Sequence, residues 1–163
     1  MCGISGIINK NNNVVDLESI THMTNLIKHR GPDDEGFFIK NNFAFGFRRL
    51  AILDLSADGH QPMHYLDQRY TLIFNGEIYN YLELKKELIE NNYKFKSNTD
   101  SEVILASYDM WGEDCVNKFN GMWSFAIYDS INNKIFCSRD RFGIKPFYYS
   151  SLNSQFIFGS EIK

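Results

Sequence analysis

The sequence predicts an α+β fold in which helices cover antiparallel β-sheets. About nine short runs of apolar and aromatic residues have the length of strands, whereas only a few stretches show helical periodicity. The helical stretches cluster along the chain instead of alternating with single strands, so the pattern is not that of a parallel βαβ fold. Aromatic residues make up 15% of the chain, which also favours β structure.

The first half of the chain contains one predicted helix and several strands. Residues 4–8 are apolar, with Gly3 and Gly6 among them, which is typical of a buried strand. Asp16 is a candidate N-cap for a helix that runs to about His29, because apolar residues recur at helical spacing from Leu17 onward. Further extended segments are expected at 36–40, 43–48 and 50–55, with a hairpin at 41–42 and loops at 31–34 and 58–62.

The second half contains two more predicted helices. Asn80, with Glu83 three residues later, has the pattern of a capping box for a helix that ends at about Asn91. Asp100 is a candidate cap for a helix over 103–111, which Gly112 ends. Strands are expected at 70–74, 122–128, 135–137, 147–149 and 156–158, with turns at 132–133 and 153–154.

The composition is that of one globular domain spanning residues 1–163. The chain is 44% hydrophobic and 23% charged, and its net charge is −3 without a long run of one sign, so neither a nucleic-acid nor a membrane surface is predicted. There is no secretory signal and no apolar run long enough to span a bilayer. The three cysteines are far apart and form no CxxC motif, which argues against disulfides and zinc and fits a reducing cytoplasm.

Cys2 directly follows the initiator methionine. If an aminopeptidase removes Met1, Cys2 carries a thiol and a free α-amine on adjacent carbons. The amine has a pKa near ~8 and the thiol near ~8.5, so the amine can take the thiol's proton near neutral pH. Nucleophile and base would then come from one residue. The alternative is a chance cysteine, since a free cysteine is more often a small buried hydrophobe.

Other polar residues interrupt apolar segments in a way that suits a ligand. Asn75-Gly76 offers an amide and an unhindered N–H, both donors for an oxyanion, although the isolated dipeptide is more often a tight turn. Arg49 can grip a carboxylate, or lie solvated beside Arg48. Asp100 can pair with an ammonium group, cap a helix, or do both. Together with a nucleophile, these groups suit an α-amino acid with an amide side chain.

Metal and nucleotide sites have little support. His60 and His64 have the spacing of helical metal ligands, but Pro62 between them argues against a helix and no further ligands can be nominated. The chain has no G-x-G-x-x-G motif and no phosphate-binding loop, so no ATP site is predicted within it.

Several longer motifs occur in order along the chain, and they cover essentially all of it. They are the start Met-Cys-Gly-Ile-Ser-Gly-Ile, the segments 29–36 (HRGPDDEG), 48–54 (RRLAILD) and 75–80 (NGEIYN), and further on 121–126 (GMWSFA) and 139–146 (RDRFGIKP). They resemble class II glutamine amidotransferase domains. The Pro-Asp after His-Arg-Gly, and the form Asn-Gly-Glu-Ile-Tyr-Asn, resemble the glutamine-hydrolysing asparagine synthetases.

The resemblance implies an N-terminal-nucleophile hydrolase fold, which is a four-layer αββα sandwich of two antiparallel sheets. It implies that Cys2 becomes the first residue and attacks the glutamine side-chain amide, with its own α-amine as the base. Asn75 and Gly76 match the positions that stabilise the oxyanion. The positions that bind the substrate in the family are matched by Arg49 for the carboxylate, by Glu77 and Asp100 for the α-amine, and by the backbone near Ile52 and Leu53.

Full-length relatives of this kind carry a second, ATP-dependent synthetase domain that receives the ammonia through a tunnel. This chain ends about where that domain would start, so it is expected to be the glutaminase half, with the C-terminal synthetase domain as its partner. No cofactor is expected in this domain, since ATP and magnesium belong to the synthetase domain. The ammonia acceptor stays open, either aspartate or another carboxylate such as a sugar acid, and so does the formation of a homodimer.

Two alternatives remain. The first is a glutamine-sensing or docking module without hydrolysis, which a retained Met1 would favour because the blocked amine could not act as a base. The second is an N-terminal-nucleophile hydrolase of another amide, against which Arg49 and Asp100 argue, because both suit a free amino acid.

Overall fold

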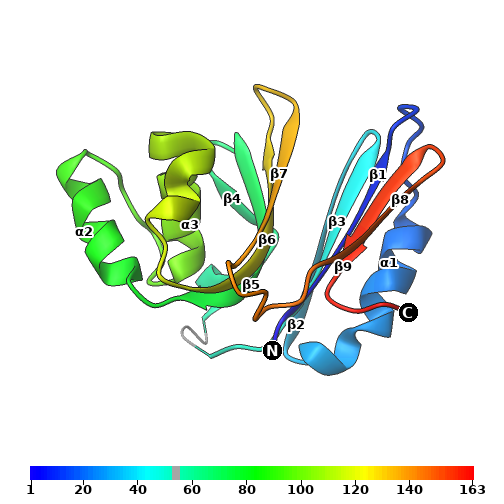
Figure 1. Ribbon diagram of the computed structural model, residues 1–163, viewed down its shortest axis with the longest axis horizontal. Helices are drawn as coiled ribbons and strands as arrows, with labels where there is room; N and C mark the ends of the chain where they lie inside the picture. The colour runs from blue at the N-terminus through cyan, green and yellow to red at the C-terminus, as the bar shows by residue number, and fades with distance from the viewer. Residues whose placement is uncertain (53–55) are drawn as a thin grey trace.

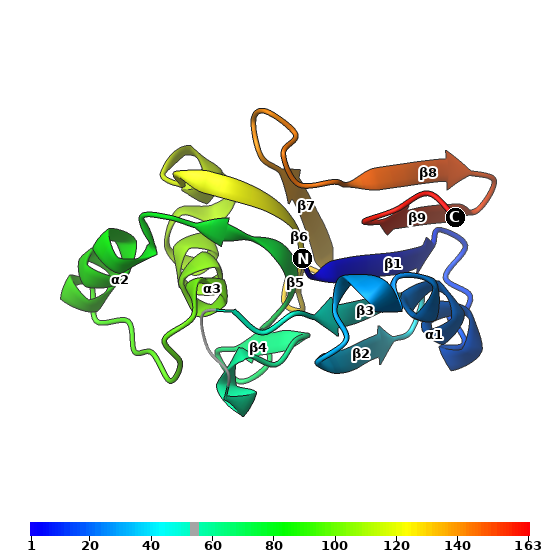
Figure 2. The same ribbon diagram turned by 90° about the horizontal axis from the view of Figure 1, so that it is seen from below.

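The computed structural model describes residues 1–52 and 56–163, and it contains two antiparallel sheets that face each other between helical layers (Figures 1 and 2). One sheet has five strands in the order β2 (Asp34–Lys40), β3 (Phe43–Arg49), β1 (Gly3–Asn9), β9 (Gln155–Gly159) and β8 (Tyr148–Leu152). The other has four, in the order β4 (Met63–Tyr65), β5 (Tyr70–Ile78), β6 (Gly121–Asp129) and β7 (Lys134–Arg139).

Helices cover the outer faces of both sheets. Helix α1 (Leu17–Leu26) lies against the five-stranded sheet, whereas α2 (Tyr81–Glu90) and α3 (Asp100–Trp111) lie on the side of the four-stranded sheet (Figure 1). Short 3₁₀ helices occur at Lys28–Arg30, Ala57–Gly59 and Gly112–Asn117. Within the described part of the chain, no helix has the length and apolar character needed to cross a bilayer. The layer order confirms the predicted αββα sandwich.

The alternation of side chains along the strands creates separate cores between these layers. In β1, Ile4 packs between the two sheets, whereas Ile7 packs toward α1. In β5, Ile73 faces the other sheet, whereas Leu72 and Phe74 face the side of α3. The central strands are therefore apolar on both faces, which explains why they read as continuous hydrophobic runs in the sequence.

The predicted helix ends are partly correct. Asp16 caps α1 by accepting a hydrogen bond from the Ser19 N–H, and Gly112 ends α3 with φ 60°, as expected. The prediction that α1 reaches His29 is wrong, because the chain tightens into a 3₁₀ turn after Leu26. The capping box is also wrong, because the Asn80 side chain bonds to the backbone at Asn120 and Lys118 instead of to its own helix.

Most strand predictions hold, but the extended segment predicted at 50–55 is wrong for residues 50–52, because β3 ends at Arg49, and residues 53–55 lie outside the described part of the chain. The hairpin turns at Asn41, Asn133 and Asn153 are confirmed, each with a positive φ that Asn tolerates. Strand β4 was not predicted, since its three residues are too short to show a pattern. Asn75-Gly76 is not a turn: β5 continues through it to Ile78, so the turn interpretation of this dipeptide is wrong.

Candidate active site

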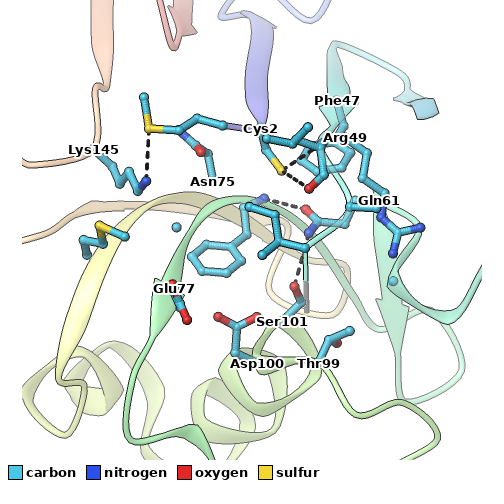
Figure 3. A pocket seen from close by; sticks show the side chains of 18 residues that line it. Cys2, Phe47, Arg49, Gln61, Asn75, Glu77, Thr99, Asp100, Ser101 and Lys145 are labelled. Atoms are coloured by element: carbon cyan, nitrogen blue, oxygen red, sulfur yellow. Dashed lines mark hydrogen bonds between the residues drawn. The ribbon is translucent and has the colours of Figure 1, made fainter. Parts of the chain in front are cut away.

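A cavity opens where the start of β1, the end of β3, the second half of β5 and the start of α3 meet (Figure 3). Its volume is about 120 Å³, several times the roughly 15 Å³ that a single water molecule needs. Every predicted site residue in the described part of the chain lines it: Cys2, Arg49, Ile52, Asn75, Gly76, Glu77 and Asp100. Leu53, the remaining predicted residue, lies outside the described residues.

Cys2 lies at the mouth of this cavity, immediately before the central strand β1. Its Sγ donates to the Leu50 carbonyl at 3.6 Å and accepts from the Leu50 N–H at 3.4 Å. Arg30 Nε donates to the Cys2 carbonyl oxygen at 3.0 Å, which fixes the backbone from the other side. Burial raises the pKa of the Cys2 thiol, whereas the Leu50 N–H, the terminal amine and the cations of Arg49 and Lys145 work in the opposite direction.

Asn75 reaches into the cavity from β5, the second sheet. Its side chain is 1% exposed, and its Nδ2 is buried without a hydrogen-bond acceptor among the described residues. Leaving a buried donor unpaired costs free energy, and this amide, which lines the cavity, is available to hydrogen-bond an oxygen placed there.

Gly76 offers a second donor beside it. The N–H groups of Phe74 and Ile78 point away from β6, because they donate to Gln61 Oε1 and Asp100 Oδ2. Gly76 lies between them in the alternation of the strand, so its N–H points toward the same edge, where the cavity lies. Glycine is required, because a Cβ at this position would overlap the Met122 carbonyl oxygen on β6.

Arg49 ends β3 and forms the wall opposite the carboxylates. It is only 8% exposed, so the interpretation as a solvated arginine is wrong. Its Nη1 donates to the Ser56 carbonyl at 2.8 Å, and Gly59 lies so close to the guanidinium that a Cβ there would overlap Nη2. The guanidinium is therefore fixed in place and borders the cavity, as a carboxylate-binding group must be.

Asp100 and Glu77 provide the negative charge of the cavity. Asp100 begins α3, is 5% exposed, and uses its carboxylate to accept from the Ile78 N–H at 2.9 Å. It does not cap the helix with its side chain, since Thr99 holds the N-cap position, so that interpretation is wrong. Burial raises the pKa of Asp100 to about 6; the Ile78 N–H opposes this rise and the Glu77 charge adds to it. The two carboxylates of Asp100 and Glu77 together form a place where a cation can bind.

Residues that sequence reasoning did not assign also line the cavity, among them Gln61, Ser101 and Lys145. Gln61 accepts from the Phe74 N–H at 2.6 Å and donates to Ser101 Oγ at 3.2 Å, so it ties β5 to the start of α3. A lone Gln beside a proline carries no pattern that could have identified it. Lys145 lies in the 139–146 motif, in which no sequence pattern indicates a binding or catalytic role for this lysine.

The two histidines each hydrogen-bond to another side chain. His60 bonds to Asp34 Oδ2 at 2.6 Å and His64 to Thr71 Oγ1 at 3.0 Å. In residues 1–52 and 56–163, no three His, Cys, Asp or Glu side chains are grouped as metal ligands would be.

Comparisons with known proteins identify the relatives of this chain. The chain is 51% identical over 181 residues to "Putative asparagine synthetase [glutamine-hydrolyzing] 2" of Methanocaldococcus jannaschii, with all of this chain and 34% of that protein covered. It is 44% identical over 166 residues to "Asparagine synthetase [glutamine-hydrolyzing] 1" of Bacillus subtilis, again over the whole chain and 26% of that protein. The chain thus spans about a third or less of the length of these curated relatives.

A solved structure supports the fold. The glutamine phosphoribosylpyrophosphate amidotransferase from B. subtilis superposes with a TM-score of 0.79 over 98% of this chain and 42% of that one, at 19% identity. The model of the family described as "Glutamine amidotransferase domain" matches residues 1–163. Because the family model matches its whole length and these relatives are 44–51% identical to it, the chain belongs to the glutamine amidotransferase domain family.

Proposed function

We propose that this chain hydrolyses the side-chain amide of glutamine to glutamate and ammonia, with Cys2 as the nucleophile. The observation that carries the proposal is the convergence of different groups in one cavity. A thiol and a guanidinium come from one sheet, two hydrogen-bond donors come from the other, and a carboxylate comes from α3. The relatives are named as glutamine-hydrolysing enzymes, which supports the same reaction.

The cavity fits the two ends of a free amino acid. The α-carboxylate of glutamine binds the buried guanidinium of Arg49, and its α-ammonium binds Asp100 and Glu77. With both ends held by these groups, the side-chain amide is the part of glutamine that is left to reach the thiol.

The chemistry begins when Met1 has been removed. The α-amine of Cys2 takes the proton of the thiol, and Sγ attacks the amide carbon of the glutamine side chain. The carbonyl oxygen becomes an oxyanion that accepts hydrogen bonds from Asn75 Nδ2 and the Gly76 N–H. The protonated amine gives its proton to the leaving nitrogen, the C–N bond breaks and ammonia departs. Water then attacks the thioester, the C–S bond breaks, and glutamate leaves as the thiol regains its proton.

We further propose that the ammonia serves an ATP-dependent synthetase domain that follows this domain in the full-length protein. The relatives, which are about three to four times longer than the matched segment, support this, as does the word synthetase in their names. ATP and magnesium would belong to that domain and no cofactor to this one. The acceptor would be aspartate or another carboxylate. A reducing compartment such as the cytoplasm would keep the Cys2 thiol free.

Intact-mass spectrometry with a glutamine analogue that carries an electrophile at the γ-carbon tests the proposal. We expect loss of Met1 and a single adduct, mapped to Cys2. Cys2→Ala should give no adduct and no hydrolysis while keeping its fold, whereas Cys137→Ala, the matched control at a cysteine outside the cavity, should react normally. A chain that keeps Met1 and takes no adduct would instead favour the glutamine-docking module.

A further inference from the structure

The 139–146 motif brings a buried lysine to the nucleophile. This segment connects β7 to β8, and Lys145 is 6% exposed although its charged end lines the cavity. In Figure 3, Lys145 approaches Cys2 from the side opposite Arg49. Two cations from different parts of the chain therefore flank the thiol.

The backbone of Lys145 is held from both sides. Asp140 accepts from the Lys145 N–H at 2.9 Å and from the N–H groups of Phe142 and Ile144, while Arg139 donates to the Lys145 carbonyl at 2.7 Å. Burial raises the pKa of Asp140, but these N–H groups outweigh it and keep the pKa below its usual range, so the carboxylate stays charged. Because hydrogen bonds hold the backbone of this loop, the Lys145 side chain is directed into the cavity and not out into solvent.

The ammonium of Lys145 has a weak partner in the unprocessed chain. Among the described residues, its Nζ donates only to the Met1 sulfur, at 3.2 Å, and a thioether is a poor acceptor. Removal of Met1 takes this partner away. The charged groups that then face Lys145 are Cys2, Glu77 and Asp140, which favour its charge, and Arg30, which opposes it. Burial lowers the pKa of Lys145 and is the largest influence on it.

We propose that Lys145 is the electrostatic partner of Cys2 and holds the thiol in its reactive thiolate form once Met1 has been removed. This role rests on the proposed function, because the Cys2 thiolate is the nucleophile in glutamine hydrolysis. Arg30 also lies near Cys2 but is paired with Glu161. Arg49 is the other side-chain cation that acts on the thiol, and its charge is matched by the substrate carboxylate when glutamine is bound. Lys145 is then the cation that continues to act on the sulfur.

The test is the pH dependence of Cys2 alkylation by iodoacetamide, followed by peptide mass spectrometry without glutamine. An opposite charge close to a titrating group moves its midpoint by roughly one to three pH units. We expect Lys145→Met, which keeps the side-chain length and removes the charge, to raise the Cys2 midpoint by about one unit or more. Lys145→Arg should retain most of the wild-type midpoint.

Lys134→Met is the matched control, because it makes the same change at an exposed position that pairs with Glu113 and lies outside the cavity. It should leave the Cys2 midpoint unchanged. An unchanged midpoint in folded Lys145→Met would overturn the proposal, and so would an equal shift in Lys134→Met, which would indicate an effect of net charge alone. If Lys145→Met does not fold, as judged by circular dichroism, Lys145→Gln gives the same comparison.

Hydrolysis provides the second readout. Lys145→Met should lower kcat/KM for glutamine near neutral pH, and the deficit should shrink as pH rises and the thiolate forms unaided, while the glutamine Kd stays unchanged. Alkylation requires no turnover, so a chain that never hydrolyses glutamine would refute the proposed function while the alkylation midpoints still decide the role of Lys145.

Discussion

Asn75 differs from the neighbouring buried amide Gln61. Both ends of the Gln61 amide are hydrogen-bonded within the chain, whereas Asn75 Nδ2 has no acceptor in residues 1–52 and 56–163. Leaving a buried donor unpaired costs roughly 1–3 kcal/mol. Asn75 therefore contributes little to folding through this group, which is the behaviour expected of a residue kept for binding.

We predict that Asn75→Ala lowers the rate of glutamine hydrolysis about 10²–10³-fold, because one oxyanion donor is lost. The free energy of unfolding should not fall correspondingly, because no hydrogen bond of Nδ2 is broken. Steady-state kinetics and urea denaturation measure the two quantities. Asn13→Ala, at an exposed position, is the matched control and should be near wild type in both. A rate within a few-fold of wild type for Asn75→Ala would remove Asn75 from the oxyanion role.

We predict that Asp100 makes the binding of glutamine sensitive to pH. Its pKa in the folded chain is about 6, against an ordinary value of 3.8, chiefly because of burial. The ammonium of glutamine needs the ionised carboxylate, so glutamine should bind more weakly as pH falls through about 6. We expect calorimetric titration to show a higher Kd at pH 5 than at pH 8. Asp58→Asn, an exposed control, should keep this dependence, whereas Asp100→Asn should bind weakly at both values.

The same shift has a consequence for stability. Between pH 3.8 and about 6 the folded chain holds a proton on Asp100 that the unfolded chain has released. The contribution of this group to the free energy of unfolding therefore decreases as pH rises through that window. Asp100→Asn should lack this decrease and be more stable than wild type at pH 8, as measured by urea denaturation. Equal pH profiles for the two proteins would contradict the assignment.

At the level of elements, Gly112 ends α3 through its backbone conformation. Its φ of 60° and ψ of −143° lie in a region that is nearly restricted to glycine, and a Cβ there would meet no other atom within 4 Å. We predict that Gly112→Ala lowers the free energy of unfolding by about 1–3 kcal/mol through backbone strain alone, with hydrolysis retained.

Gly159 in β9 is the control for this substitution, because it lacks a positive φ and an added Cβ would make only ordinary contacts at 3.6 Å. Gly159→Ala should change stability far less. Urea denaturation of both variants measures the difference. If Gly112→Ala were as stable as wild type, the explanation of the helix end by backbone strain would be wrong.

At the level of the whole molecule, the site depends on the packing of the two sheets. Cys2 and Arg49 belong to the five-stranded sheet, whereas Asn75, Gly76 and Glu77 belong to the other (Figures 1 and 3). The core between the sheets, in which Phe45 packs edge-on against Phe158, sets the distance between Cys2 and the Asn75-Gly76 segment. This arrangement predicts that the halves of the domain unfold together.

Phe45→Ala should lower the free energy of unfolding by about 3–5 kcal/mol, because a fully buried ring is replaced by a cavity. Both tryptophans, Trp111 and Trp123, lie on the opposite side, in the layers of α3 and β6. Trp fluorescence and Cys2 alkylation during urea denaturation should therefore shift by the same amount. A shift in alkylation with an unchanged fluorescence transition would show that the sheets unfold independently; Phe45→Leu gives the milder version of the test.

The sequence pattern by itself determined the α+β class and most of the elements, whereas the four-layer arrangement was expected from the resemblance of the longer motifs. Apolar runs, Asn turns and Gly112 are local signals that act over a few residues, and β1, α1, α3 and the hairpins follow from them. The long motifs also indicated which residues to expect in the site, although Asn75-Gly76 as an isolated dipeptide favours a tight turn.

Tertiary structure alone decided three matters. It showed that Asn75-Gly76 is strand and not turn, since pairing with β6 outweighs the local turn preference. It showed that Arg49 is buried and that Asp100 bonds to β5 instead of its own helix. It also brought Lys145 to Cys2, across 143 positions of sequence. Contacts between residues so far apart arise only when the sheets pack, and no local pattern in the sequence encodes them.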